Sequence, residues 1–318
     1  MIGSQKAIPG RFHNVVHTAA ILAVMAALFG LLGWMVFGVL GFLWALVAVA
    51  LLLTTTPRLT PPMILRMYGA RSLSYDESPG LHRIVSELSR RAGIGNAPKL
   101  YYVASSVMNA FSVGSRTNSA IALSDGLIRH LSRREITGVL AHEMSHIKNN
   151  DLKLHTYADM MTRITSLFSF IGQLLVLFYI PVFLFSEERV PFLFILILIT
   201  APALSVLLQL ALSRAREFVA DATAVQFTRD PRGLASALQK MDAYEKNFWD
   251  VIRFPGKDNP HPSILRTHPH TRERIDRLMR LGVFASRKDT DLPEMLFLPE
   301  DVPEVLQPPR RHWSGPWF

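Results

Sequence analysis

The chain has 318 residues, of which 49% are hydrophobic and 19% charged, with a formal net charge of +9 and no cysteine. This composition departs from that of an average soluble domain and indicates membrane segments. Without cysteine, disulfides and thiolate metal sites are excluded, so His, Asp and Glu are the only strong ligands for a transition metal. Lysines and arginines are dispersed among acidic residues, without a phosphate-binding loop or a basic stripe with interleaved aromatics. We therefore expect no nucleic-acid partner and a basic surface beside anionic lipid.

The first predicted element is a pair of membrane spans. From about Thr18 to Leu53 the chain carries no charge. A single helix of that length would measure roughly 54 Å, well beyond the ~30 Å of a hydrocarbon core. Two spans joined by a tight turn fit better, and four glycines mark where the turn can fall: Gly30, Gly33, Gly38 and Gly41. A cleavable signal peptide is the alternative, which the length of the run and the lack of a cleavage site disfavour.

Three short elements are expected next. Pro79–Ala92 has apolar residues at helical spacing and predicts an amphipathic helix. Lys99–Ala104 and Ser119–Leu123 are typical of short strands, split by polar turn residues. Asn109-Ala110-Phe111 lies between these two strands. The pattern predicts a small β-sheet accompanied by helices.

A longer helix follows, and a capping box marks its start. Ser132 stands at the N-cap position and Glu135 three residues later. Apolar residues then recur at helical spacing: Ile136, Val139, Leu140, Met144 and Ile147. We expect this face to pack and the other face to look into a cleft.

His142-Glu143-Met144-Ser145-His146 is the most informative stretch of the chain. His142 and His146 are one helical turn apart, so both imidazoles can bind one metal ion. Glu143 projects beside the first ligand, where it can deprotonate a metal-bound water as general base. The alternative is two unrelated histidines on a surface helix. The capping box and the apolar face favour the metal site.

A second apolar pair covers Ile164 to Phe185 and Val190 to Leu212, separated by a short polar link. Each segment is about long enough to cross a membrane. An apolar hairpin packed partly against the catalytic domain is the alternative. Lysines and arginines collect before and after each pair rather than between its members. The positive-inside rule therefore predicts that both termini and the catalytic site lie in the cytoplasm.

A zinc protease site needs a third protein ligand, which leaves the fourth position for water. The best candidate follows the second apolar pair, where Glu217 and Asp221 are spaced one helical turn apart. Glu217 is predicted to be the ligand, and Asp221 to orient the N–H of a ligating histidine. The alternative is a solvated acidic face paired with neighbouring arginines.

The order of these motifs resembles the HtpX-type integral-membrane zinc metalloproteases, relatives of the CAAX prenyl proteases. The resemblance runs from the first apolar hairpin to about residue 280. The matching pieces are His-Glu-x-x-His, Arg-Glu-Phe-x-Ala-Asp at residues 216–221, Asn109-Ala110-Phe111, Asn149, Asp151, Thr267-His268-Pro269 and Arg274. It implies one zinc ion (Zn2+) per chain, a gluzincin-like fold and cleavage of membrane or misfolded proteins.

The resemblance also implies roles for residues outside the metal motif. Asn109, Ala110 and Phe111 are similar to an edge strand that pairs with an extended substrate, with an ordinary sheet strand as the alternative. Asn149 is expected beside the metal ligands. His268 is the candidate for stabilising the oxyanion, or else it orders the turn before a helix at about residues 272–281.

The predicted fold class is α+β, mainly α, with a gluzincin-like zinc protease domain, a small β-sheet and about four transmembrane helices. We expect five segments: 1–57 with the first hairpin, 58–163 with the His-Glu-x-x-His helix, 164–212 as the second hairpin, 213–285 with the third ligand, and 286–318 as a Pro-rich flexible tail. The expected location is the cell inner (plasma) membrane, multi-pass.

The predicted function is a zinc endopeptidase for protein quality control, with protein substrates and the lipid bilayer as partners and the oligomeric state left open. One alternative is a processing protease with one lipidated or membrane substrate. Another is a non-catalytic adaptor that keeps zinc for stability. Glu143 argues against the adaptor, because a structural zinc site needs no base.

Overall fold

The computed structural model describes residues 11–54, 61–185, 192–252, 271–282, 311–312 and 315–316. The chain divides into two units. We call residues 1–57 and 153–216 the helical unit, and residues 58–152 and 217–318 the sheet unit. The chain thus divides at 57/58, 152/153 and 216/217, whereas the predicted segment boundaries at 163/164 and 212/213 followed hydropathy alone. The five-segment division stays a prediction.

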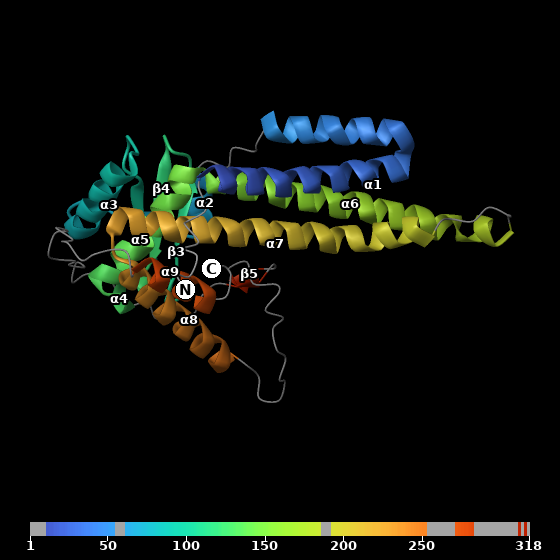
Figure 1. Cartoon of the computed structure of the whole chain (residues 1–318). Helices are drawn as coiled ribbons and strands as arrows, with labels where there is room; N and C mark the ends of the chain where they lie inside the picture. The colour runs from blue at the N-terminus through green and yellow to red at the C-terminus, as the bar shows by residue number, and fades with distance from the viewer. Residues whose placement is uncertain are drawn as a thin grey trace, which may run out of the picture. The chain divides into compact units, whose positions relative to one another are not determined.

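Three helices of the described chain are long and apolar enough to cross a membrane: α1 (Arg11–Thr54), α6 (Asp151–Phe185) and α7 (Phe192–Thr228). About four spans were expected, and the difference in count lies in α1. Its helix breaks at Gly38, where φ is 63° and ψ −149°, and the chain folds back (Figure 1). A Cβ on Gly41 would lie 2.0 Å from the carbonyl oxygen of Gly33, so only glycine allows the two halves to approach this closely.

Helices α6 and α7 run side by side (Figure 1) and share hydrogen bonds within their apolar surroundings. Pro202 lies inside α7 and has no N–H, so it cannot bond the carbonyl of Leu198 four residues earlier. Ser169 Oγ and Gln173 Nε2 of α6 both donate to that carbonyl. A kink-forming proline is therefore tolerated because the neighbouring helix supplies the missing donors.

The sheet unit contains a four-stranded mixed sheet in the order β1-β2-β4-β3. Its strands are β1 (Arg71–Ser72), β2 (Lys99–Val103), β3 (Ala110–Gly114) and β4 (Ser119–Ser124). β2 and β4 are parallel, and the two outer pairings are antiparallel. All six residues of β4 are buried, whereas β3 pairs among the described strands with β4 alone and there forms an edge of the sheet. The predicted strands at 99–104 and 119–123 are thereby confirmed.

Helices cover this sheet and one another. They are α2 (Pro61–Met67), α3 (Pro79–Ala92), α4 (Asp125–His130), α5 (Arg133–Asn149), α8 (Pro231–Ile252) and α9 (Thr271–Gly282). α3 has the predicted bounds and ends at Gly93 in the left-handed conformation. α5 packs against α3, β3 and α8. Gly138 of α5 allows the closest approach, since a Cβ there would lie 2.9 Å from the backbone of Leu234 on α8.

Two predictions at the carboxyl end fall mainly outside the described residues. The Thr267-His268-Pro269 motif is among them, as is most of the Pro-rich segment 286–318. Within that segment two short strands are described, β5 (Arg311–His312) and β6 (Gly315–Pro316), which pair antiparallel. The helix expected near residues 272–281 is confirmed as α9.

Candidate metal centre

The α5 helix presents the metal motif because its other face is fixed in the core. The predicted capping box is present: Ser132 Oγ accepts from the backbone N–H of Glu135, and Glu135 Oε2 accepts from that of Ser132 at 2.7 Å. The apolar residues predicted to pack are all buried in one core cluster: Ile136, Val139, Leu140, Met144 and Ile147. With that face packed, His142 and His146 lie on the side of the helix that meets Glu217 of α7.

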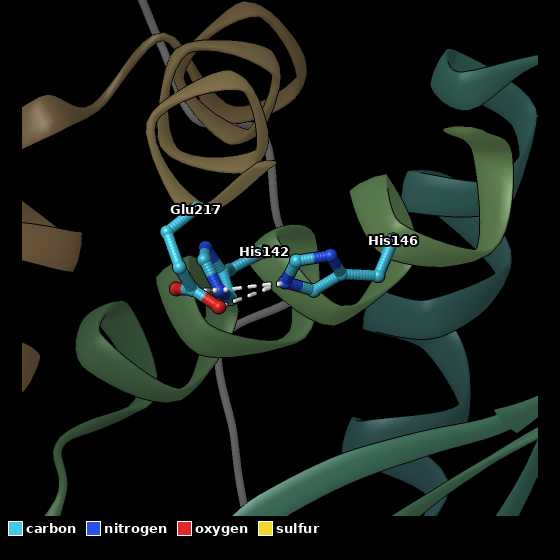
Figure 2. A group of neighbouring side chains, drawn as sticks. All are labelled: His142, His146 and Glu217. Atoms are coloured by element: carbon cyan, nitrogen blue, oxygen red, sulfur yellow. Dashed lines mark hydrogen bonds and ion pairs between the residues drawn. The ribbon is translucent and has the colours of Figure 1, made fainter. Parts of the chain in front are cut away.

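Three side chains converge on one point (Figure 2). His142 and His146 come from α5 and Glu217 from α7. The two Nε2 atoms are 3.1 Å apart, and Glu217 places one carboxylate oxygen 3.3 Å from Nε2 of His142 and the other 3.7 Å from Nε2 of His146. One ligand atom from each residue lies within 4.8 Å of the others, which is the spacing that a shared metal ion requires.

The second nitrogen of each imidazole meets a carboxylate. Nδ1 of His142 lies 3.0 Å from Asp221 Oδ1, and Nδ1 of His146 lies 2.8 Å from Asp151 Oδ2. A carboxylate at Nδ1 holds the proton on that nitrogen, so the lone pair of Nε2 faces the common point. Both histidines are therefore held in the tautomer and orientation that a metal ligand needs.

Asp151 reaches His146 because of a turn between two helices. α5 ends at Asn149, and its C-cap residue, Asn150, adopts the left-handed conformation with φ of 55°. Asn is one of the few residues that accept this conformation at a helix end. α6 begins with Asp151 directly afterwards, so its fully buried carboxylate comes back beside His146.

Arg274 of α9 joins the two acidic residues of α7. Its guanidinium makes a bidentate pair with Asp221, at 2.8 Å from Nε and 2.7 Å from Nη2, and its Nη1 lies 3.0 Å from Glu217 Oε2. All three side chains are buried. Burial is costly for a charge unless it is paired, so this arrangement fixes the rotamers of Glu217 and Asp221 together.

Acidic side chains surround the two histidines. Four carboxylates gather around the two histidines, from Glu143, Asp151, Glu217 and Asp221, and all are buried. Arg274 is a buried cation paired with two of them, Glu217 and Asp221. Burial and the charge of Arg274 lower the pKa of His142, but Asp221 and Glu217 outweigh them and raise it to about 10. A metal ion would displace this proton.

The other predicted site residues lie as follows. Asn149 donates from Nδ2 to Ser145 Oγ at 3.2 Å, on its own helix. The backbone N–H of Asn109 donates to Ser124 Oγ at 2.8 Å, just before β3. Ala110 and Phe111 lie on β3 at the sheet edge, and the Phe111 ring is 4.6 Å from that of Tyr68. His268 lies outside the described residues.

The structure shows roles for two residues to which the sequence analysis assigned none. Asp151 and Arg274 stood only as matching pieces of a resemblance, without a role. The signal for Arg274 was its place one turn before Leu278, on the buried stripe of an otherwise polar helix. For Asp151 the signal was an acidic residue directly after two asparagines, five residues beyond the predicted ligand His146.

Two histidines one turn apart, a carboxylate from a second helix and a Glu directly after the first histidine define the class of His-Glu-x-x-His metallopeptidases. Comparison with known proteins identifies the family. The model of peptidase family M48 matches residues 76–281. This chain belongs to peptidase family M48.

Its relatives span nearly the same length. A protease HtpX homolog of Paraburkholderia phytofirmans is 35% identical over 292 residues, covering 85% of this chain and 97% of that protein. A protease HtpX homolog of Salinibacter ruber is 32% identical over 281 residues, covering 85% and 98%. Among solved structures, the crystal structure of S. mikatae Ste24p is 21% identical with a TM-score of 0.44, and the match covers 82% of this chain and 62% of that one.

These findings confirm the predicted class of protein. The chain is a multi-pass membrane protein and a zinc metalloendopeptidase, mainly helical with a small mixed sheet. Its donor set of two imidazoles and one carboxylate suits zinc. Proteins are its substrates and the lipid bilayer its surroundings.

Proposed function

We propose that this chain hydrolyses peptide bonds in membrane or misfolded proteins, as a protein quality-control endopeptidase with its site on the cytoplasmic side of the inner membrane. One observation carries the hydrolytic part: His142, His146 and Glu217 converge with Glu143 directly beside them on α5. A structural zinc site would close its fourth position with protein. Among the described residues, three ligands converge here and a carboxylate directly follows the first of them on α5.

His142, His146 and Glu217 would hold the zinc ion. When bound, zinc supplies the Lewis acidity that makes water nucleophilic near neutral pH and polarises a carbonyl. Asp221 and Asp151 keep the two imidazoles in the ligating tautomer, and Arg274 holds Glu217 and Asp221 in place. These side chains set the geometry before substrate arrives, which limits the reorganisation needed during the reaction.

Glu143 is the general base. It would take a proton from the attacking water as the water adds to the scissile carbonyl, and then give that proton to the leaving amine. Its burial supports this role, because a carboxylate shielded from bulk water exchanges its proton with the substrate rather than with solvent. His268 is proposed to stabilise the oxyanion, with ordering of the turn before α9 as its alternative role.

The substrate is proposed to pair with β3 in an extended conformation. β3 pairs with β4 alone within the sheet, and α5, which carries the metal motif, packs against it. Backbone pairing suits an endopeptidase that accepts many sequences, since main-chain hydrogen bonds do not depend on side-chain identity. Ala110 and Phe111 would supply the contacts at this edge.

The test is cleavage of an unfolded protein by the purified, zinc-loaded chain in detergent. We expect the parent to cut and Glu143→Ala to be slower by about 10²- to 10⁴-fold at equal zinc content, the range for loss of a general base. Glu273→Ala is the control, because Glu273 is an exposed residue of α9 paired with Arg277. Equal cleavage by Glu143→Ala and the parent would remove Glu143 from the mechanism.

The same assay separates the alternatives. A processing protease with a single substrate would hold zinc and leave the unfolded protein intact, yet cut a lipidated or membrane partner in a Glu143-dependent way. An adaptor would cut neither.

Orientation needs a separate measurement. The chain has no cysteine, so a single Cys at the exposed Arg90 is the only thiol. In intact cells a membrane-impermeant maleimide should label it only after the membrane is opened. Labelling of intact cells would place the sheet unit outside the cytoplasm.

A further inference from the structure

α2 exposes an apolar face that the sheet unit does not cover. Among the described residues of this unit, the exposed large hydrophobic side chains are Met63, Met67, Tyr75 and Met279. Two of these four lie on the seven-residue helix α2, with Met63 54% and Met67 62% exposed. Such a concentration on one short helix indicates a partner for that face.

The helix geometry explains why both methionines point outward. Leu65 is 1% exposed and packs with Val113, Ala120 and Ala122 of the sheet. At about 100° per residue, positions two before and two after Leu65 both lie roughly 160° around the helix from it. Met63 and Met67 therefore share the face opposite the anchor, one turn apart. Arg66 is exposed beside them, and α2 contains no acidic residue.

The covalent chain limits how far α2 can lie from the bilayer. α1, a membrane-spanning helix, ends at Thr54, and α2 begins at Pro61. The linking residues 55–60 can span at most about 25 Å when fully extended. The polar interface of a bilayer is itself several ångströms thick on each side of the hydrocarbon core. A helix tethered this closely to a span stays within reach of that interface.

We propose that α2 is an interfacial anchor whose Met63 and Met67 insert at the boundary between lipid headgroups and acyl chains, with Arg66 contacting lipid phosphates. Flexible apolar side chains flanking a cation match this boundary, where the apolar atoms leave water and the charge remains hydrated. α2 packs against β3 and β4. The anchor would hold this edge of the sheet near polypeptide segments that emerge from the bilayer.

The test uses the full chain in liposomes of phosphatidylcholine and phosphatidylglycerol, with a nitroxide spin label at a single Cys. Because the chain has no cysteine of its own, Met63→Cys, Met67→Cys and Met279→Cys each carry one label. Met279 is the matched control: an exposed methionine of the same unit, on α9. Zinc content of one ion per chain shows that each variant is folded.

At positions 63 and 67 we expect the label to collide more with dissolved oxygen, which partitions into lipid, than with the water-soluble relaxation agent Ni-EDDA. At position 279 the order should be reversed. Ni-EDDA accessibility at 63 and 67 equal to that at 279 would overturn the proposal. So would shielding that arises only after an unfolded protein is added, because that result would make the face a substrate surface.

Discussion

Arg274 donates two hydrogen bonds to the carboxylate of Asp221, 2.8 Å from Nε and 2.7 Å from Nη2, across 53 residues of sequence. The pair is buried, and the same guanidinium reaches Glu217. α9 therefore takes part in the metal centre without supplying a ligand. Its arginine fixes the side chain that orients His142 and the carboxylate predicted to bind zinc.

Replacing Arg274 should weaken zinc binding. Arg274→Gln leaves Asp221 and Glu217 buried without their cation, and Arg274→Lys keeps the charge but loses the planar fork that binds both oxygens. We expect zinc affinity to fall about 10- to 100-fold in the Gln variant, as for other residues that orient metal ligands. Titration against a chelator of known affinity measures it. Unchanged affinity in both variants would show that the pair serves folding alone.

Substitutions of Asp151 and Asn149 should have very different effects on zinc affinity, although the two residues are only two positions apart. Asp151→Asn removes the carboxylate from Nδ1 of His146, and we expect about a 10- to 100-fold loss of zinc affinity. Asn149→Ala should leave affinity within about twofold, because its side chain bonds Ser145 of the same helix. The two variants are compared in the same chelator titration. A larger effect at Asn149 than at Asp151 would reverse the assignment.

The lowered pKa of Glu135 predicts how the folding stability of the chain changes with pH. Burial alone raises the pKa of Glu135, but hydrogen bonds from Lys240, Ser236 and Ser132 outweigh it and lower the pKa to about 2. A carboxyl with a lowered folded-state pKa stabilises the fold above its unfolded value of about 4.5 and loses this contribution as pH falls toward 2. The contribution at neutral pH is on the order of 1 kcal/mol, because the partner Lys240 is about half exposed and water screens the pair.

The measurement is thermal unfolding of the parent and Glu135→Gln in detergent, from pH 7 to pH 2. The variant should be less stable at pH 7 and should converge on the parent as pH falls below about 4.5. The exposed Glu273→Gln is the control and should follow the parent throughout. A difference that stays constant with pH would contradict the ionic role of Glu135.

The hydrogen bonds to the Leu198 carbonyl predict that the cost of losing Ser169 and Gln173 depends on Pro202. Replacing both Ser169 with Ala and Gln173 with Leu leaves this carbonyl without the donors that α6 supplies. We expect a loss of about 1–2 kcal/mol, the upper part of the range for such bonds in membranes. With Pro202→Ala the residue at 202 regains an N–H, which can bond Leu198, and the same double substitution should cost less. If the melting-temperature shifts of Pro202→Ala and of the double substitution simply add in the combined variant, the proline and the two donors act independently.

Much of the local structure was predictable. Helix α3, strands β2 and β4, the capping box of Ser132 and Glu135, and the apolar stripe of α5 follow from periodicities of neighbouring residues. The reversal within the first apolar run was expected as well, because one helix would be too long for a bilayer. The sequence did not decide which of its four glycines breaks the helix. In the structure Gly38 adopts the positive φ, and Gly33 and Gly41 allow the backbones of the two halves to come close together.

The sequence by itself determined that His142 and His146 share one face of a helix, because a spacing of four residues places them there in any α-helix. The sequence could not determine which residues of other helices contact these two histidines. Glu217 faces the Nε2 atoms and Asp221 an Nδ1 atom because residues 217–221 of α7 lie beside α5. Arg274 lies 132 residues from His142 along the chain. Periodicity encodes which face of a helix is buried. The partner of that face depends on how distant segments pack, and only the tertiary structure decides it.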